Sequence, residues 1–100
     1  MHMEYFKMVA LRAYDQVNSA IWSDAITVAR AYNNDWHLPT KIEFKLLYEQ
    51  RMIVGNFTKD DYWSSTKLDS NSAWIQGFLN GDQDRYNKYS KLKVRAVWSF

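Results

Sequence analysis

Trp36-His37-Leu38-Pro39-Thr40-Lys41-Ile42-Glu43-Phe44 is the stretch that decides the fold of this chain. It contains the only proline and the clearest helix-start signal of the sequence. Thr40 and Glu43 have the spacing of a capping box, in which the two side chains satisfy free backbone donors at the start of a helix. Pro39 fixes the backbone before that start and disfavours helix at Leu38. The stretch therefore predicts the junction between two helices of one small domain.

The helices on either side of this junction are predicted from apolar residues at helical spacing. The first helix begins at Trp22, with Ser23 or Asp24 favouring its positive N-terminus. Its apolar stripe is Trp22, Ala25, Ile26, Ala29 and Tyr32. The second helix begins at Thr40 and frays near Arg51. Its predicted buried face is Ile42, Leu46, Leu47 and Tyr48.

Strand-forming residues occupy most of the remaining chain. Strands are predicted over residues 3–11, 61–66, 73–79 and 93–100, with a return strand or irregular loop over 82–89. Asn80-Gly81 predicts a two-residue type I′ hairpin turn. In the last strand, alternation places Val94, Ala96 and Trp98 on one face. This order predicts an α+β fold, with two helices packed on a mainly antiparallel twisted sheet. Residues 1–100 form a single domain, and residues 1–2 have the pattern of a cloning remnant.

Composition excludes several classes of function. The 100 residues include five Trp, seven Tyr and five Phe, which favour an efficient aromatic core. The chain has no cysteine, so disulfides, zinc–thiolate sites and a cysteine nucleophile are excluded. The net charge of only +2 does not by itself imply a nucleic-acid or membrane partner. No membrane span or signal peptide is predicted, which favours a cytoplasmic or virion-associated protein unless the chain was trimmed.

Five segments in order carry a family resemblance. They are Trp22-x-x-Ala25, Trp36-x-Leu38-Pro39-Thr40-x-x-Glu43-Phe44, Tyr62-Trp63-Ser64-Ser65-Thr66, Ala73-Trp74 with Phe78 and Gly81, and Val94-Arg95-Ala96-Val97. Together they resemble an uncharacterised bacterial and phage domain family, found for example at the C-terminus of collagen-like bacterial adhesins. That family is similar to the C-type-lectin-like fold of formylglycine-generating enzymes and of retroelement-diversified receptor-binding proteins. Here His37 and Trp98 stand where the family usually has basic residues.

The resemblance implies a rigid scaffold that displays loops and no catalytic chemistry. The copper-binding cysteines of formylglycine-generating enzymes and the calcium-lectin signatures are absent from the sequence. No catalytic residue, cofactor or metal is therefore predicted. The residues that carry the motif are predicted to be structural: Trp36, Leu38, Pro39, Thr40, Glu43, Trp63, Trp74 and Arg95.

Residues 81–93 are the predicted contact surface, because they interleave basic residues with Tyr and Asn. Tyr and Arg are enriched in binding hot spots, and loops on rigid scaffolds often carry function. The predicted partner-binding residues are Arg85, Tyr86, Asn87, Lys88, Tyr89 and Lys91. The function predicted is a non-enzymatic binding module for a protein or glycan. In a phage it would be a receptor-binding piece or an inhibitor of a host protein.

Two other functions stay open at the level of sequence. One is an enzyme-derived domain of the formylglycine-generating type without its cysteines. The other is a binder of nucleic acid or another acidic polymer through the basic, Tyr-rich segment. The sequence is also compatible with an oligomer of this chain.

Four smaller features of the sequence can each be interpreted as structural or as functional. Glu43 and Arg95 could pair between the second helix and the last strand. Asp82 and Asp84 could bind calcium, although solvated loop charge is favoured. His37 is predicted to be a hydrogen-bonded structural residue. The hydroxyls over residues 64–66 are predicted to bond in turns and to pack.

Overall fold

The computed structural model of the chain describes residues 17–31, 36–55 and 57–98. The strand predicted over residues 3–11 and the predicted stripe position Tyr32 lie outside these residues. The elements in chain order are β1 (Val17–Ala20), α2 (Trp22–Arg30), β2 (Trp36–His37), α3 (Lys41–Glu49), α4 (Arg51–Val54), β3 (Asp61–Lys67), β4 (Ser72–Gly77), β5 (Gln83–Asn87), β6 (Leu92–Val94) and β7 (Val97–Trp98).

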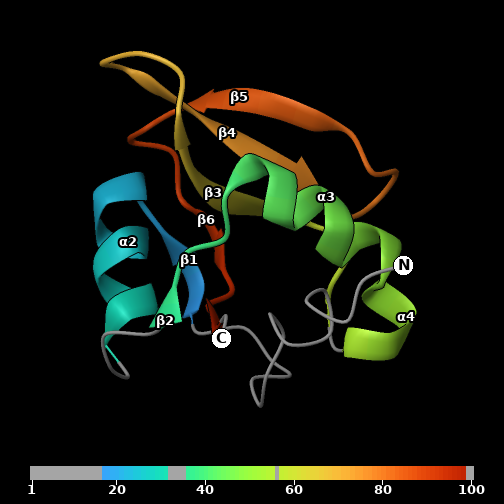
Figure 1. The fold of residues 1–100 in the computed structure, drawn as a ribbon. Helices are drawn as coiled ribbons and strands as arrows, with labels where there is room; N and C mark the ends of the chain where they lie inside the picture. Colours follow the sequence, from blue (N-terminus) through green and yellow to red (C-terminus); the bar gives the residue numbers. More distant parts are fainter. Residues whose placement is uncertain (1–16, 32–35, 56, 99–100) are drawn as a thin grey trace.

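Five of the strands form one mixed sheet in the order β1-β6-β3-β4-β5. The central strand β3 is antiparallel to β4 and parallel to β6, and β5 lies at one edge, antiparallel to β4. β2 and β7 form a separate two-stranded sheet. Figure 1 shows α2 on one side of the domain and α3 with α4 on the other. The α+β class is confirmed, with three helices rather than two among the described residues.

The start of α3 is the capping box that the sequence predicts. The Thr40 hydroxyl accepts a hydrogen bond from the Glu43 amide at 3.2 Å, and the Glu43 carboxylate accepts one from the Thr40 amide at 2.9 Å. Two further bonds fasten this start to β3. The Ser65 amide donates to the Pro39 carbonyl at 2.8 Å, and the Lys41 amide donates to the Thr66 hydroxyl at 3.0 Å. The helix therefore begins at a fixed position and rotation on the sheet.

That rotation determines which side of α3 is buried. Phe44 and Leu47 are fully buried, whereas Ile42 is 75% exposed, so the predicted burial of Ile42 is wrong. Helical spacing alone predicted the burial of Leu47 but also placed Ile42 on the buried side. The buried side is determined by how the capped start of the helix attaches to β3. α3 contributes to a cluster on one face of the sheet, formed by Phe44, Leu47, Tyr62, Phe78 and Val97.

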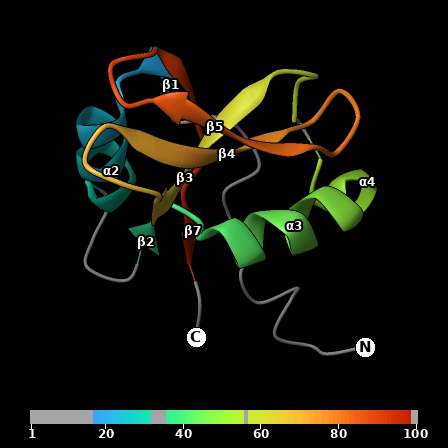
Figure 2. The ribbon, with the colours of Figure 1, turned by 90° about the horizontal axis from the view of Figure 1, so that it is seen from above.

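A second core cluster lies on the other face, where α2 packs. Figure 2 shows α2 and α3 well separated around the sheet. Neighbouring residues of a strand point to opposite faces, so Trp63 belongs to the second cluster while Tyr62 belongs to the first. Both indole N–H groups at this interface have partners, because Trp63 donates to the Ala20 carbonyl at 2.8 Å and Trp22 donates to the Ser64 carbonyl at 2.9 Å.

α2 begins at Trp22 with the acidic residue Asp24 in its first turn, as the sequence predicts, but without a side-chain cap. Its N-cap is Ile21, which forms no side-chain capping bond, and Asp24 lies in the first turn. The Trp22 amide donates instead to the Lys88 carbonyl at 3.0 Å. A distant turn of the chain thus satisfies the first backbone donor of this helix.

The end of the chain is two short strands rather than the single strand predicted over residues 93–100. β6 belongs to the large sheet and β7 to the small one. Val94 and Ala96 nevertheless pack in the same core cluster, as their predicted common face requires, and Val97 packs in the other cluster. The two residues between these strands, Arg95 and Ala96, are both buried. The Arg95 guanidinium lies 4.0 Å from the centre of the Phe57 ring. The Glu43 carboxylate accepts from Thr40 and bonds to His37, not to Arg95.

The connection between β4 and β5 is longer than the predicted two-residue turn. β4 ends at Gly77 and β5 starts at Gln83, because Phe78 leaves the strand and is buried against α3. Gly81 has φ +87°, and a Cβ built there would lie 2.5 Å from the Tyr48 ring. Gly81 therefore permits both the backbone turn and its close contact with α3.

The acid dependence of stability should depend on Glu43. Burial raises the pKa of this carboxyl, but the hydrogen bonds from His37 and from the Thr40 amide together lower it below its ordinary value. The stabilisation is complete above the unfolded pKa of about 4.3 and is lost as the pH falls through the lower folded pKa. In urea denaturation across this range, Glu43→Gln should lessen the loss of stability on acidification. Glu49→Gln on the same helix should keep the wild-type profile; equal profiles for the two variants would contradict this role.

Gly81→Ala should reduce the free energy of unfolding by more than Gly55→Ala. Both glycines have positive φ, which costs an L-residue roughly 1–2 kcal/mol, but a Cβ at Gly55 has no neighbour within 4 Å. The difference between the variants in urea denaturation isolates the contact with Tyr48. If Gly81→Ala is no more costly than Gly55→Ala, the β4–β5 connection does not rest on α3 as described.

Candidate binding surface

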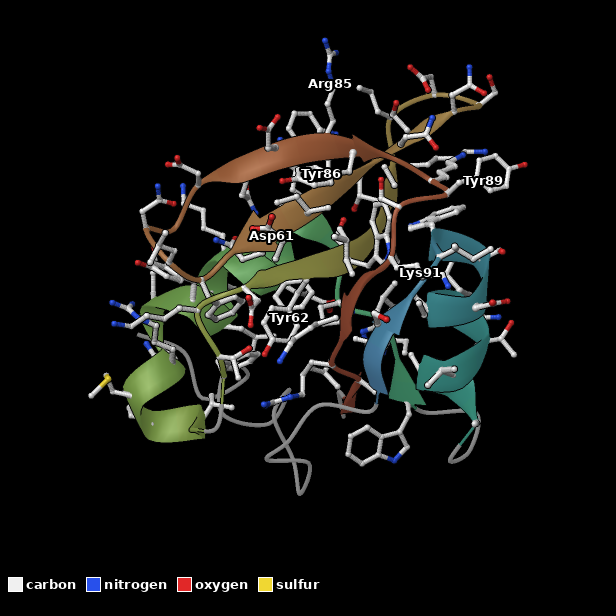
Figure 3. The ribbon with its side chains drawn as sticks, turned by 180° about the vertical axis from the view of Figure 1, so that it is seen from behind. Asp61, Tyr62, Arg85, Tyr86, Tyr89 and Lys91 are labelled. Atoms are coloured by element: carbon white, nitrogen blue, oxygen red, sulfur yellow. The ribbon has the colours of Figure 1, made fainter. Side chains whose placement is uncertain are left out.

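The predicted contact residues lie on β5 and on the turn that leads from β5 to β6. Residues 81–93 are called the arm below. β5 is an edge strand, so among the described residues one of its sides has no neighbouring strand. Figure 3 shows that the labelled residues of the arm differ in direction: Arg85 points away from the sheet, whereas Tyr86 points toward Asp61. The arm therefore combines side chains that hold it in place with side chains that face solvent.

Tyr86 holds the arm to the sheet. Its ring is half-buried beside the cluster that contains Trp63, and its hydroxyl donates to the Asp61 carboxylate at 2.9 Å. This hydrogen bond raises the pKa of Tyr86, and the negative charge of Asp61 adds to the effect. Tyr86 was predicted to contact a partner, but its hydroxyl is already bonded within the domain.

Asn87 and Lys88 hold the turn. The Asn87 side chain accepts from the Tyr89 amide, and the Asn87 carbonyl accepts from the Ser90 amide, both at 2.9 Å. The Lys88 amide donates to the Asn71 carbonyl at 2.8 Å, and the Lys88 carbonyl accepts from Trp22. The turn is thus bonded at one residue to both the β3–β4 connection and the start of α2.

The Lys88 side chain is also occupied. Its ammonium donates to the backbone carbonyls of Asp69 at 2.8 Å and Ser70 at 3.3 Å. It also lies 4.5 Å from the centre of the Trp22 ring, within the range of a cation–π interaction. Lys88 therefore contributes more to the shape of this region than to its free positive charge.

Arg85, Tyr89 and Lys91 are the members of the predicted set whose side chains are exposed and form no hydrogen bond or ion pair that the described residues show. Tyr89 is 79% exposed although its backbone is held on both sides. The Arg85 amide donates to the Asp84 carboxylate at 2.8 Å, so this part of the edge strand is already capped. The arrangement offers side-chain contacts more readily than pairing with an added strand.

Two hollows flank the turn. One, of about 240 Å³, is lined by Ile21, Trp22, Ser23, Ser70, Asn71, Lys88 and Tyr89. The other, of about 370 Å³, lies along α2 and includes Lys91. Sequence reasoning assigned Trp22 to a helix stripe and Asn71 to a turn, and it missed that both border Tyr89. No local sequence pattern indicates that these residues lie together, because their three segments meet only in the folded chain.

Acidic residues surround the other end of the arm. A hollow of about 210 Å³ contains Asp61, Asp82 and Asp84 beside Tyr86. Across the sheet, Lys93 lies 3.5 Å from Asp60. Within residues 17–31, 36–55 and 57–98, no group of three or more His, Asp or Glu side chains is placed to hold a metal ion. The arm is consequently mixed in charge rather than uniformly basic.

The residues of the sequence motif lie mostly away from this surface. Trp36, Leu38, Pro39 and Trp63 are buried. Trp74 is half-buried, with the Lys41 ammonium 3.6 Å from its ring centre. The hydroxyls of Ser64 and Thr66 form structural bonds, since the Ser64 hydroxyl donates to the Trp74 carbonyl and the Thr66 hydroxyl accepts from the Lys41 amide. His37 lies 3.0 Å from the Glu43 carboxylate, as expected of a structural residue.

Comparison with known proteins places the domain in a family. A search of curated proteins finds no match. In the part of the chain that the structure describes, no helix is long and apolar enough to cross a membrane. The family model described as Lcl C-terminal domain matches residues 6–98, which is nearly the whole chain. The chain therefore belongs to the Lcl C-terminal domain family.

Proposed function

We propose that this chain is a non-enzymatic binding module that contacts a protein or glycan through the arm. The observation that carries the proposal is the combination of a bonded backbone with an exposed aromatic side chain at Tyr89. A binding surface that is ordered before association loses less conformational entropy on binding. The fixed turn therefore presents a large aromatic side chain whose backbone loses little conformational entropy on binding.

The composition of the exposed set supports the same function. Arg and Tyr are among the side chains enriched at binding hot spots, and Arg85 and Tyr89 are both exposed on the arm. They project from an edge strand and a turn whose other residues fasten it to the domain. The structural use of Ser64 and Thr66 supports a binding role over nucleophilic catalysis.

The fold that we propose for this module is C-type-lectin-like, akin to the C-terminal domain of collagen-like adhesins. The order of the sequence motifs and the packing of helices on a twisted mixed sheet support this assignment. In such a scaffold the buried motif residues maintain the frame. Sequence changes in the surface segments can then alter which partner is bound without changing the core.

An acidic polymer remains a second candidate partner because Arg85 and Lys91 are exposed on the same arm. Binding of this kind depends on released counterions and weakens steeply with salt. The aspartates beside the arm disfavour it, since Asp82 and Asp84 repel a polyanion. Salt dependence therefore separates the two candidates.

Affinity capture from host lysate and from a glycan mixture tests the proposal. A variant combining Arg85→Ala, Tyr89→Ala and Lys91→Ala should lose at least about 2 kcal/mol of binding free energy toward any partner of the wild type. The loss should persist at high salt. The matched control is Met52→Ala, because Met52 is 89% exposed but lies on α4.

Two results would count against this function. If the arm variant retains every partner that the wild type binds, the arm is not the contact surface. If binding disappears with salt and is insensitive to Tyr89→Ala, the partner is an acidic polymer.

A further inference from the structure

We propose that the hollow between Trp22 and Tyr89 binds one uncharged sugar ring of a glycan. This inference rests on the proposed function and narrows its partner from protein or glycan to glycan. The hollow is lined by the start of α2, the β3–β4 connection and the turn of the arm. Its volume of about 240 Å³ is below the roughly 300–1,000 Å³ typical of sites for drug-sized molecules, which suits a single ring.

The aromatic side chain that would contact the sugar is Tyr89. An aromatic ring has a negative face, and the C–H groups on one side of a pyranose present weakly positive hydrogens to it. Tyr89 is 79% exposed, so its ring can receive a ligand. The hydrogen bond from its amide to the Asn87 side chain holds the residue at the edge of the hollow. Figure 3 shows Tyr89 projecting from the outer end of the arm.

The polar part of the lining matches hydroxyl groups. Ser23, Ser70 and Asn71 line the hollow, and the side chain of each can both donate and accept hydrogen bonds. Among the described residues, these three side chains form no hydrogen bond with one another or with a neighbour. Sugar hydroxyls also donate and accept, so they can satisfy such a lining more fully than an apolar peptide side chain.

The charges in the hollow favour an uncharged ligand. The Lys88 ammonium is shared between two backbone carbonyls and the Trp22 ring. Of the residues that the structure describes, Lys88 is the only charged one that lines the hollow. Because its ammonium is engaged in holding the turns, it is less available to bind a sulfate or phosphate group on the ligand, and no described carboxylate lines the hollow to favour an ammonium group.

Titration of the ¹⁵N-labelled domain with neutral methyl glycosides tests the inference. The probes are the methyl glycosides of glucose, galactose, mannose and N-acetylglucosamine, each followed by amide chemical shifts. At least one probe should produce saturable shifts centred on Ser23, Asn71 and Tyr89, with a Kd on the order of 1 mM, as is usual for a single weakly held ring.

Substitutions make the test specific. Tyr89→Ala should weaken binding about tenfold by removing the ring contact, whereas Tyr89→Phe should retain it. Asn71→Ala should also weaken binding because it removes an amide from the lining. Leu79→Ala is the control, since Leu79 is 70% exposed but lies in the β4–β5 connection. The same spectra show whether each variant is folded.

The outcomes separate this inference from the proposed function. If none of the four glycosides shifts these amides, or if Tyr89→Ala binds as tightly as the wild type, the sugar site is refuted. A protein captured through Tyr89 in the absence of sugar binding would refute the sugar site and leave the binding module intact. A heparin fragment that competes at low salt and loses affinity in Lys91→Ala would identify an acidic polymer instead. Neutral glycan binding that survives loss of Arg85 and Lys91 supports the inference.

Discussion

The interaction on which the rest of the structure depends is the attachment of the start of α3 to β3. Pro39 and Lys41 each form a backbone hydrogen bond with this strand, one with the Ser65 amide and one with the Thr66 hydroxyl. They flank Thr40, whose capping box already fixes the first turn of the helix. Because the helix can then neither slide nor rotate, Phe44 and Leu47 are directed into the core. The local sequence signal thus acts by setting a tertiary position.

The same attachment reaches the proposed binding surface. The Lys41 carbonyl accepts from the Gln83 side chain at 2.7 Å, and Gln83 also donates to Gln76 at 3.0 Å. Gln83 is the first residue of β5, so the junction and the arm are joined by a partly buried path of hydrogen bonds. At the far end of β5, the bonds of Lys88 to Asn71 and Trp22 complete the support. The arm is held at both ends by the frame that the motif builds.

The sequence was a reliable guide where one local rule determined the structure. The capping box, the start of α2 at Trp22 and the strands around residues 61–66 and 73–77 needed only spacing and strand propensity. It failed where tertiary packing, not local sequence, determines the structure. Ile42 is exposed although its spacing predicts burial, and Phe78 lies outside the predicted strand because it packs against Phe44 of α3. It also failed at Arg95 and Ala96, where the chain passes from one sheet to the other and the predicted single strand is interrupted.

The candidate surface was predictable in position but not in the roles of its residues. Composition identified residues 81–93, yet it could not divide the set into Tyr86, Asn87 and Lys88, which hold the arm, and Arg85, Tyr89 and Lys91, which face solvent. For Tyr86 and Lys88, that division depends on partners 17 to 66 residues away, such as Asp61, Asn71 and Trp22. Trp22 and Asn71 entered the surface for the same reason.

The bonds of Tyr86, Asn87 and Lys88 require the arm to be ordered before any partner binds. Backbone ¹⁵N relaxation of the isolated domain measures this directly. Order parameters of about 0.85 are expected for residues 83–90, equal to those of a rigid backbone such as β3. Values below about 0.6 across the turn at residues 87–90 would show a flexible segment, and the arm would then not be ordered in advance of binding.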